Sequence, residues 1–330
     1  MGCFFYMPKM NRVIPIFLPM LACPHRCVYC NQYVISGQQK LPEIKDVLST
    51  VEMYLSTIPA DCHTRVAFFG GSFTCLPESV QNRYLDAVRP YVVSGRIRGI
   101  QLSTRPDYIS DEILCNLKAR GVSVVELGAQ SLDDEVLRLC GRGHTVEDVR
   151  RASELVVRHG MELGLQMMVG LPGDTKTKAL RTAERIVEFG AKYTRIYPTL
   201  VVEGTALAED FRAGRYVPLS LGEAVDWCKD LYRFFVSAGV TVLRLGLHPT
   251  RDLREGDHLL AGPFHISFKE LVLTALWRDR ILNQMKQEGR DDITVLVPEG
   301  EMNYAVGYGS ANRKAFPKAV FAAARGLTRP

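Results

Sequence analysis

The sequence lacks the long apolar runs of an integral membrane protein: no stretch reaches the roughly 18 residues that a membrane-spanning helix needs. It also lacks a secretory signal, because residues 1–7 are apolar but lead into Pro8, Lys9 and Arg12 rather than into a small-residue cleavage site. No dense basic arm stands out, with 41 Lys and Arg against 36 Asp and Glu. We therefore expect a cytoplasmic protein whose formal charge of +5 permits an anionic partner without requiring one.

Cysteine is sparse, and its distribution is informative. The chain has nine cysteines, an odd number in a sequence too long to depend on disulfides. Six are scattered singly and are interpreted as small apolar residues. The other three, Cys23, Cys27 and Cys30, fall within eight residues. These three clustered cysteines are the part of the sequence that most clearly indicates a functional site.

Apolar strand-like runs alternate with amphipathic helical stretches along most of the chain. The runs are residues 13–18, 65–69, 99–103, 123–127, 163–169, 193–200 and 241–245, and the helical stretches are 43–57, 78–93, 111–119, 146–159, 175–189 and 221–237. Such alternation predicts right-handed βαβ units around a parallel sheet. Six units suit a partial or full barrel, or an open doubly wound sheet, and in each case functional residues belong at the carboxyl ends of the strands.

The alternation weakens after about residue 250, which predicts two parts: a core over residues 1–250 and a C-terminal extension over 251–330 that covers the barrel. The extension is expected to contain a long loop, a helix at 268–288, a strand at 293–297 and a basic tail. We interpret the tail as solvated, with nucleic-acid contact as the alternative. Its basic residues are Arg313, Lys314, Lys318, Arg325 and Arg329.

The three clustered cysteines follow the first strand directly, with the spacing C-x3-C-x2-C. Three thiolates on one short loop can hold three irons of a cubane and leave the fourth iron open, as a catalytic site requires. A structural zinc site would need a fourth ligand, for which His25 in the same loop is an awkward candidate. Three unrelated structural cysteines remain the other alternative.

This spacing, with an aromatic residue just before Cys30, resembles the signature of the radical S-adenosylmethionine (SAM) superfamily. The resemblance extends over about residues 12–250 to the radical SAM core of the Elongator catalytic subunit. It implies an incomplete (β/α)6 TIM-like barrel with a small C-terminal extension. It also implies a [4Fe–4S] cluster on Cys23, Cys27 and Cys30 and reductive cleavage of SAM to a 5′-deoxyadenosyl radical. The matching segments occur in the same order at 68–73, 103–108, 126–134, 142–145, 170–174 and 196–200.

The resemblance also assigns SAM contacts, all placed after strands. Many superfamily members carry Glu after the paired glycines, where this chain has Ser72. A plain tight turn at the glycines and a salt-bridged turn between Arg105 and Asp107 are the structural alternatives. The expected SAM-binding residues are Gly70, Gly71, Ser72, Ser103, Thr104, Arg105, Gln130, Arg142 and Gly170.

Other polar and aromatic residues receive less specific interpretations. Tyr29 and Phe69 are expected to shield the site, Asp174 to cap a helix and Tyr197 either to line the substrate pocket or to pack. His248 is a substrate-side candidate at the end of the last strand. His144, His258 and His265 are interpreted as structural.

The resemblance ends at about residue 250, and no Gly-rich pyrophosphate loop follows. We therefore expect a core-only relative without the acetyltransferase domain or the N-terminal extension of the Elongator subunit. A flavodoxin- or ferredoxin-type protein is the expected one-electron donor, and no residue is singled out as catalytic. The first substrate hypothesis is RNA, specifically a tRNA base. The alternatives are a small metabolite or tetrapyrrole, or a non-catalytic iron–sulfur or zinc scaffold.

Overall fold

The computed structural model describes residues 11–19, 23, 25–31, 40–247 and 258–324. Its main feature is one seven-stranded parallel sheet in which the strands follow their order in the chain. The strands are β1 (Asn11–Leu18), β2 (His63–Gly70), β3 (Ile100–Thr104), β4 (Val122–Gln130), β5 (Glu162–Val169), β6 (Tyr193–Pro198) and β8 (Thr241–Leu245). A sequential parallel order is that of a barrel and not of a doubly wound sheet.

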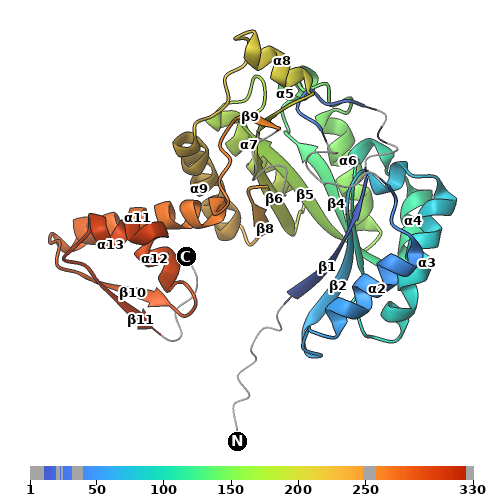
Figure 1. The fold of residues 1–330 in the computed structure, drawn as a ribbon, viewed down its shortest axis with the longest axis horizontal. Helices are drawn as coiled ribbons and strands as arrows, with labels where there is room; N and C mark the ends of the chain where they lie inside the picture. Colours follow the sequence, from blue (N-terminus) through green and yellow to red (C-terminus); the bar gives the residue numbers. More distant parts are fainter. Residues whose placement is uncertain (1–10, 20–22, 24, 32–39, 248–257, 325–330) are drawn as a thin grey trace, which may run out of the picture.

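Helices cover the outer face of this sheet (Figure 1). They are α2 (Ile44–Leu55), α3 (Glu78–Val93), α4 (Asp111–Ala119), α6 (Val146–Arg158), α7 (Lys176–Glu188) and α9 (Leu221–Ser237). Ser110 caps α4 and Ser220 caps α9, each through its side-chain oxygen. Alternate strand residues such as Ile14, Leu102 and Leu165 are fully buried against the helices, so the hydrophobic core lies between sheet and helices.

The other face of the sheet is concave, and side chains from distant strands meet across it. Arg195 on β6 lies with its guanidinium carbon 4.5 Å from the centre of the Phe69 ring on β2. Arg65 on β2 likewise pairs with Glu162 on β5 at 2.8 Å. Because β1 and β8 are the two edges of the sheet, the barrel is open. The predicted partial barrel is confirmed, with a seventh strand completing the six βα units.

Short elements decorate the carboxyl edge of the sheet. Besides the short helix α5 (Asp134–Leu139), they are η1 (Phe73–Cys75), η2 (Pro106–Tyr108), β7 (Val201–Val202), α8 (Ala206–Arg212) and β9 (Leu259–Ala261). β9 pairs antiparallel with β7, which ties the chain after residue 257 to this edge.

The C-terminal part forms a unit with its own small core. It contains α11 (Phe268–Glu288), β10 (Thr294–Pro298), α12 (Met302–Val306), η3 (Tyr308–Ser310), α13 (Ala311–Ala315) and β11 (Val320–Ala324). α11 packs against α9, and the β10–β11 pair projects beyond it (Figure 1). The predicted helix and strand are present. The expected tail is structured up to residue 324, because these residues form α13 and β11 and Lys318 pairs with Asp291 at 3.0 Å. Its basic residues Arg313, Lys314 and Lys318 are exposed, as the solvated interpretation predicts. A boundary at residue 250 and a covering role for the extension stay predictions.

None of the helices in the described ranges combines the length and the apolar character needed to cross a bilayer.

Candidate functional site

The candidate site is a cavity of about 100 Å³ at the carboxyl edge of the sheet. Loops and strand ends from β1 to β5 contribute to it, and so does the turn after α5. It is lined by Cys23, His25, Cys27, Cys30, Gly70, Gly71, Ser72, Ser103, Thr104, Gly128, Gln130, Arg142 and Gln166. The structure thus brings together all three clustered cysteines and seven of the nine residues expected to bind SAM.

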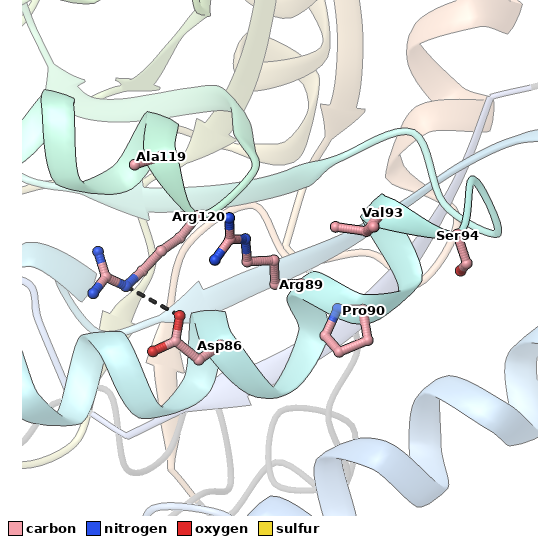
Figure 2. A pocket seen from close by; sticks show the side chains of 7 residues that line it. All are labelled: Asp86, Arg89, Pro90, Val93, Ser94, Ala119 and Arg120. Atoms are coloured by element: carbon pink, nitrogen blue, oxygen red, sulfur yellow. Dashed lines mark ion pairs between the residues drawn. The ribbon is translucent and has the colours of Figure 1, made fainter.

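A larger hollow, of about 790 Å³, lies elsewhere and has different chemistry. Figure 2 shows it near the ends of α3 and α4, which lead into β3 and β4 at the amino edge of the sheet. An ion pair between Asp86 and Arg120 at 3.1 Å crosses it. The remaining lining residues are Arg89, Pro90, Val93, Ser94 and Ala119. Since no predicted cofactor residue lines it, the smaller cavity is the candidate site.

The cysteine loop is held by backbone contacts on both sides. The Cys30 N–H donates to the Cys27 carbonyl at 3.0 Å, which forms a tight turn between two of the thiols. The Val28 N–H donates to the Cys140 carbonyl at 3.0 Å, and the Val28 carbonyl accepts from the Leu207 N–H at 2.8 Å. These bonds connect the loop to the end of α5 and to the start of α8. The loop is therefore positioned by the barrel rather than by its own sequence.

The three thiols suit a cluster with several metal ions. In the part of the chain that the structure describes, no three Cys, His, Asp or Glu side chains converge as ligands of one ion. A cubane instead takes each thiolate at a different iron, so its ligands surround a volume rather than a point. Cys27 is buried and Cys23 and Cys30 are partly buried around the same cavity.

Glycine permits close backbone approach at the end of β2. Gly70 has φ +105°, and a Cβ there would lie 2.2 Å from the Leu18 carbonyl oxygen. The Gly71 N–H donates to that same oxygen at 2.9 Å. A side chain at position 70 would therefore push the ends of β1 and β2 apart. The predicted glycine pair has a defined structural reason, in addition to the ligand contact that the resemblance implies.

Arg142 is the charged centre of the site. It is 7% exposed, donates from Nη2 to the Gly128 carbonyl at 2.5 Å and places Nη1 3.5 Å from Cys27 Sγ. Gly128 makes room for it, because a Cβ there would lie 2.8 Å from Nη2. Burial by itself would lower the pKa of Arg142, but Tyr29 and Cys27 raise it, and the net shift is upward. A permanent positive charge therefore lies beside a cysteine sulfur.

Several buried polar atoms around Arg142 have no hydrogen-bond partner among the described residues. They are Tyr29 Oη, Arg105 Nη1, Arg142 Nε and His144 Nδ1. Unpaired buried donors are costly, so such a group indicates a ligand or water that completes it. Two cationic donors and three thiols form a donor set that fits an iron–sulfur cluster and a carboxylate-bearing cofactor.

Gln130 adopts a backbone conformation that side chains rarely take. Its φ is +66°, and the pairing of β4 with β5 shifts register between Gly128 and Gln130. Such irregularities next to a site redirect a side chain at the expense of backbone strain. Gln130 lines the cavity as a result. The sequence indicated the residue through the family resemblance but contained no signal for the strain.

Two residues expected to bind SAM lie outside this cavity. Arg105 is 1% exposed and bonds both oxygens of Asp107 at 2.9 Å, as the structural alternative had it, while also donating to the Arg142 carbonyl at 2.8 Å. The Gly170 N–H donates to Asp174, and its carbonyl accepts from the Tyr216 hydroxyl at 2.6 Å. Both residues support the site from behind. Gly128, Gln166 and His25, which sequence reasoning did not assign to it, line the cavity instead.

The less specific interpretations have mixed outcomes. Burial, reinforced by Arg142 and Arg105, lowers the pKa of His144 to about 3, so this ring is a neutral structural group. The helix cap predicted at Asp174 is wrong: Thr175 caps α7, whereas Asp174 closes the preceding turn. Tyr29 is buried beside the cysteines. His248 lies outside the described residues.

A parallel half-barrel that gathers thiols, glycines and a buried guanidinium at its carboxyl edge defines an α/β enzyme of the partial TIM-barrel class. Comparison with known families gives the particular one. The radical SAM superfamily matches residues 17–186, which is more than half of the chain, and the radical SAM C-terminal domain matches residues 191–278. The chain belongs to the radical SAM superfamily. Membership implies a [4Fe–4S] cluster and SAM as cofactors.

Individual proteins are similar to parts of this chain. A tRNA uridine(34) acetyltransferase of Dehalococcoides mccartyi is 29% identical over 265 residues, covering 68% of this chain and 58% of that protein. Protein YhcC of Escherichia coli is 34% identical over 214 residues, covering 59% of this chain and 65% of that protein. The solved structure of the Methanocaldococcus infernus Elp3 with an N-terminal deletion has a TM-score of 0.62 at 22% identity, covering 85% and 64% of the two chains. The chain spans about half the length of the curated acetyltransferases that it matches.

Proposed function

We propose that this chain cleaves SAM reductively at a [4Fe–4S] cluster held by Cys23, Cys27 and Cys30 and uses the resulting radical to modify a tRNA base. One observation carries the first part: the three cysteines line a single cavity together with Gly70, Gln130 and Arg142. The printed activity of the similar acetyltransferases supports the choice of tRNA.

Bound there, the two groups would supply reductive cleavage, in which one electron passed from the cluster to the sulfonium of SAM would give methionine and a 5′-deoxyadenosyl radical. The chain's own residues hold and orient these groups. Arg142 is charged and lies 3.5 Å from Cys27 Sγ, so its positive charge faces a sulfur that would hold the cluster. Its unpaired Nε is a donor available to a carboxylate, and Gln130 presents an amide to the same cavity.

Exclusion of water is the second contribution of the protein. Tyr29 is 8% exposed, and burial raises the pKa of its hydroxyl, so it remains neutral beside the thiols. Arg105 anchors the backbone of Arg142 from the buried side. The electron would come from a flavodoxin- or ferredoxin-type donor.

Anaerobic reconstitution with iron and sulfide tests the cluster assignment. With dithionite and SAM, the wild-type protein is expected to form 5′-deoxyadenosine, detected by mass spectrometry, and to show the electron paramagnetic resonance signal of a reduced [4Fe–4S] cluster. Cys27→Ala is expected to lose both, whereas Cys115→Ala, which alters an exposed cysteine on α4, should keep both. Stoichiometric zinc without cleavage would overturn the proposal and leave a metal-stabilised scaffold.

Filter retention of cellular tRNA by the reconstituted protein tests the substrate class. Retention that competitor tRNA abolishes is expected. Its absence, together with intact SAM cleavage, would favour a small metabolite or tetrapyrrole.

A further inference from the structure

The concave face of the barrel contains a buried charged layer directly below the cofactor cavity. We call it the interior floor: Phe69, Gln101, Glu126 and Arg195. Glu126 is 1% exposed and receives two hydrogen bonds from Arg195, at 2.5 and 2.9 Å, and one from Gln101. Gln166, which lines the cavity above, donates a further bond to Glu126 at 3.2 Å.

Space for this layer is built into the backbone. The neighbouring residue on β5 is Gly164, and a Cβ there would lie 2.8 Å from Glu126 Cγ. Stability alone does not account for the layer, because replacing a buried ion pair by apolar residues is often neutral or stabilising. The Glu126–Arg195 pair is fully hydrogen-bonded inside the barrel. It is better explained by a role in fixing the position of a functional side chain.

That side chain is Tyr197. It lies two residues beyond Arg195 on β6, on the same face of the sheet and closer to the carboxyl edge. The Tyr197 side chain lies close to the Arg195 guanidinium and interacts with it electrostatically. A guanidinium has only donors, so Tyr197 would meet it with its oxygen and would keep its own O–H for another partner.

The cofactor residues leave this side of the barrel unused. All cavity-lining residues come from β1 to β5 and the turns beside them, and none comes from β6. Opposite β6, Phe17 is 38% exposed, and its ring centre is 6.3 Å from that of Phe69. The concave face therefore has polar side chains of β6 on one side and the partly exposed Phe17 ring of β1 on the other.

We propose that Tyr197 is a specificity-determining residue that binds the substrate base, with Arg195 and Glu126 as the residues that position it. This inference rests on the proposed function. Donors that face an aromatic pair suit a planar ring with carbonyl acceptors, such as a pyrimidine base, whose face packs on Phe17 and whose carbonyl accepts from Tyr197. A uridine appears in the names of the similar acetyltransferases, which agrees with this chemistry.

The test uses the reconstituted protein with SAM, dithionite and unfractionated cellular tRNA as the probe. We measure 5′-deoxyadenosine formation as a function of tRNA concentration. Tyr197→Phe removes one hydroxyl and keeps the ring. It should raise the tRNA concentration for half-maximal stimulation about tenfold, the effect of losing one good hydrogen bond, with a smaller change in the half-saturating SAM concentration.

Tyr193→Phe is the matched control. Tyr193 lies on the same strand two residues before Arg195, and its hydroxyl bonds Glu162 at 2.9 Å, away from the cavity. It should respond to tRNA as the wild type does. Glu126→Gln should raise the half-saturating tRNA concentration of the folded protein as Tyr197→Phe does, whereas a purely structural role would lower the free energy of unfolding and leave that concentration unchanged.

The outcomes separate the proposed SAM cleavage from the substrate-binding role of Tyr197. No 5′-deoxyadenosine from the wild type overturns the proposed function itself. Cleavage that tRNA does not stimulate leaves radical chemistry standing and overturns this inference. Equal tRNA responses in Tyr197→Phe and the wild type, or an equal loss in Tyr193→Phe, also overturn it.

Discussion

Two layers of the barrel interior differ in how their buried polar groups are satisfied. At the carboxyl edge, Arg142 Nε, Arg105 Nη1 and His144 Nδ1 have no partner among the described residues. One layer below, Glu126 and Arg195 bond each other and the neighbouring amides. Unpaired polar atoms indicate a layer that is completed by a ligand, whereas complete pairing indicates a layer that fixes geometry. Burial is similar in the two, so the satisfaction of hydrogen bonds separates them.

The largest expected effect comes from breaking the paired layer. Glu126→Gln and Arg195→Gln each leave one uncompensated buried charge and should each lower the free energy of unfolding by about 3–5 kcal/mol. The double variant should cost less than the sum, because both charges are then absent. Urea unfolding of the apo-protein, followed by circular dichroism, measures this cycle.

A second pair on the same face provides the control for that cycle. Arg65 and Glu162 are 19% and 30% exposed and pair at 2.8 Å. Because solvent screens them, Glu162→Gln should cost only about 1 kcal/mol. Equal costs at positions 126 and 162 would contradict the distinction between a buried positioning layer and an ordinary ion pair.

The sequence predicted the barrel well because its information is local. Apolar periodicity and helix caps such as Ser110 and Ser220 specify each βα unit without reference to the rest of the chain. The cysteines and the glycine pair were accessible for the same reason, since each motif is contiguous. The interior floor was not, because Glu126 and Arg195 are 69 positions apart and meet only when the sheet curls.

Errors arose where the competing roles of a residue look alike in sequence. Arg105 follows a strand, as a cofactor ligand would, and its guanidinium bonds Asp107 while Nη1 has no partner among the described residues, so its contact with SAM stays a prediction. Asp174 and Thr175 are both good helix caps, and only the backbone decides between them. The short α13 and β11 were missed because five-residue elements contain too little periodicity.

His144, in the layer at the carboxyl edge, predicts how the free energy of unfolding depends on pH. Burial, with help from Arg142 and Arg105, lowers the pKa of His144 to about 3, whereas an unfolded histidine titrates near 6.5. Between these two pKa values, His144 therefore binds a proton in the unfolded state but not in the folded state. The free energy of unfolding should fall as the pH drops from about 6.5 towards 3, by up to about 1.4 kcal/mol per pH unit.

His144→Gln isolates this contribution. Its amide can still donate to the Ala129 carbonyl that His144 Nε2 contacts at 3.3 Å, but it does not titrate. Urea unfolding of the apo-protein at a series of pH values should show a shallower dependence in the variant between pH 6 and 4. Parallel curves for the two proteins would mean that His144 is not held neutral by burial and its two cationic neighbours.

The smallest expected effect concerns Gln130, the residue with a strained backbone in the layer at the carboxyl edge. A left-handed conformation costs a residue with a side chain roughly 1–2 kcal/mol, and glycine avoids this cost while adding about 0.5–1 kcal/mol of chain entropy to lose on folding. With φ +66° at Gln130, Gln130→Gly should therefore raise the free energy of unfolding of the apo-protein slightly, by up to about 1 kcal/mol, while weakening SAM binding. Gln130→Ala removes the same amide but keeps the Cβ, so it should weaken SAM binding without any gain in stability. Urea unfolding and equilibrium dialysis of SAM measure the two quantities separately. If both variants gain stability equally, the backbone is not the source of the strain; if neither weakens SAM binding, the amide at this position serves the fold and not the cofactor.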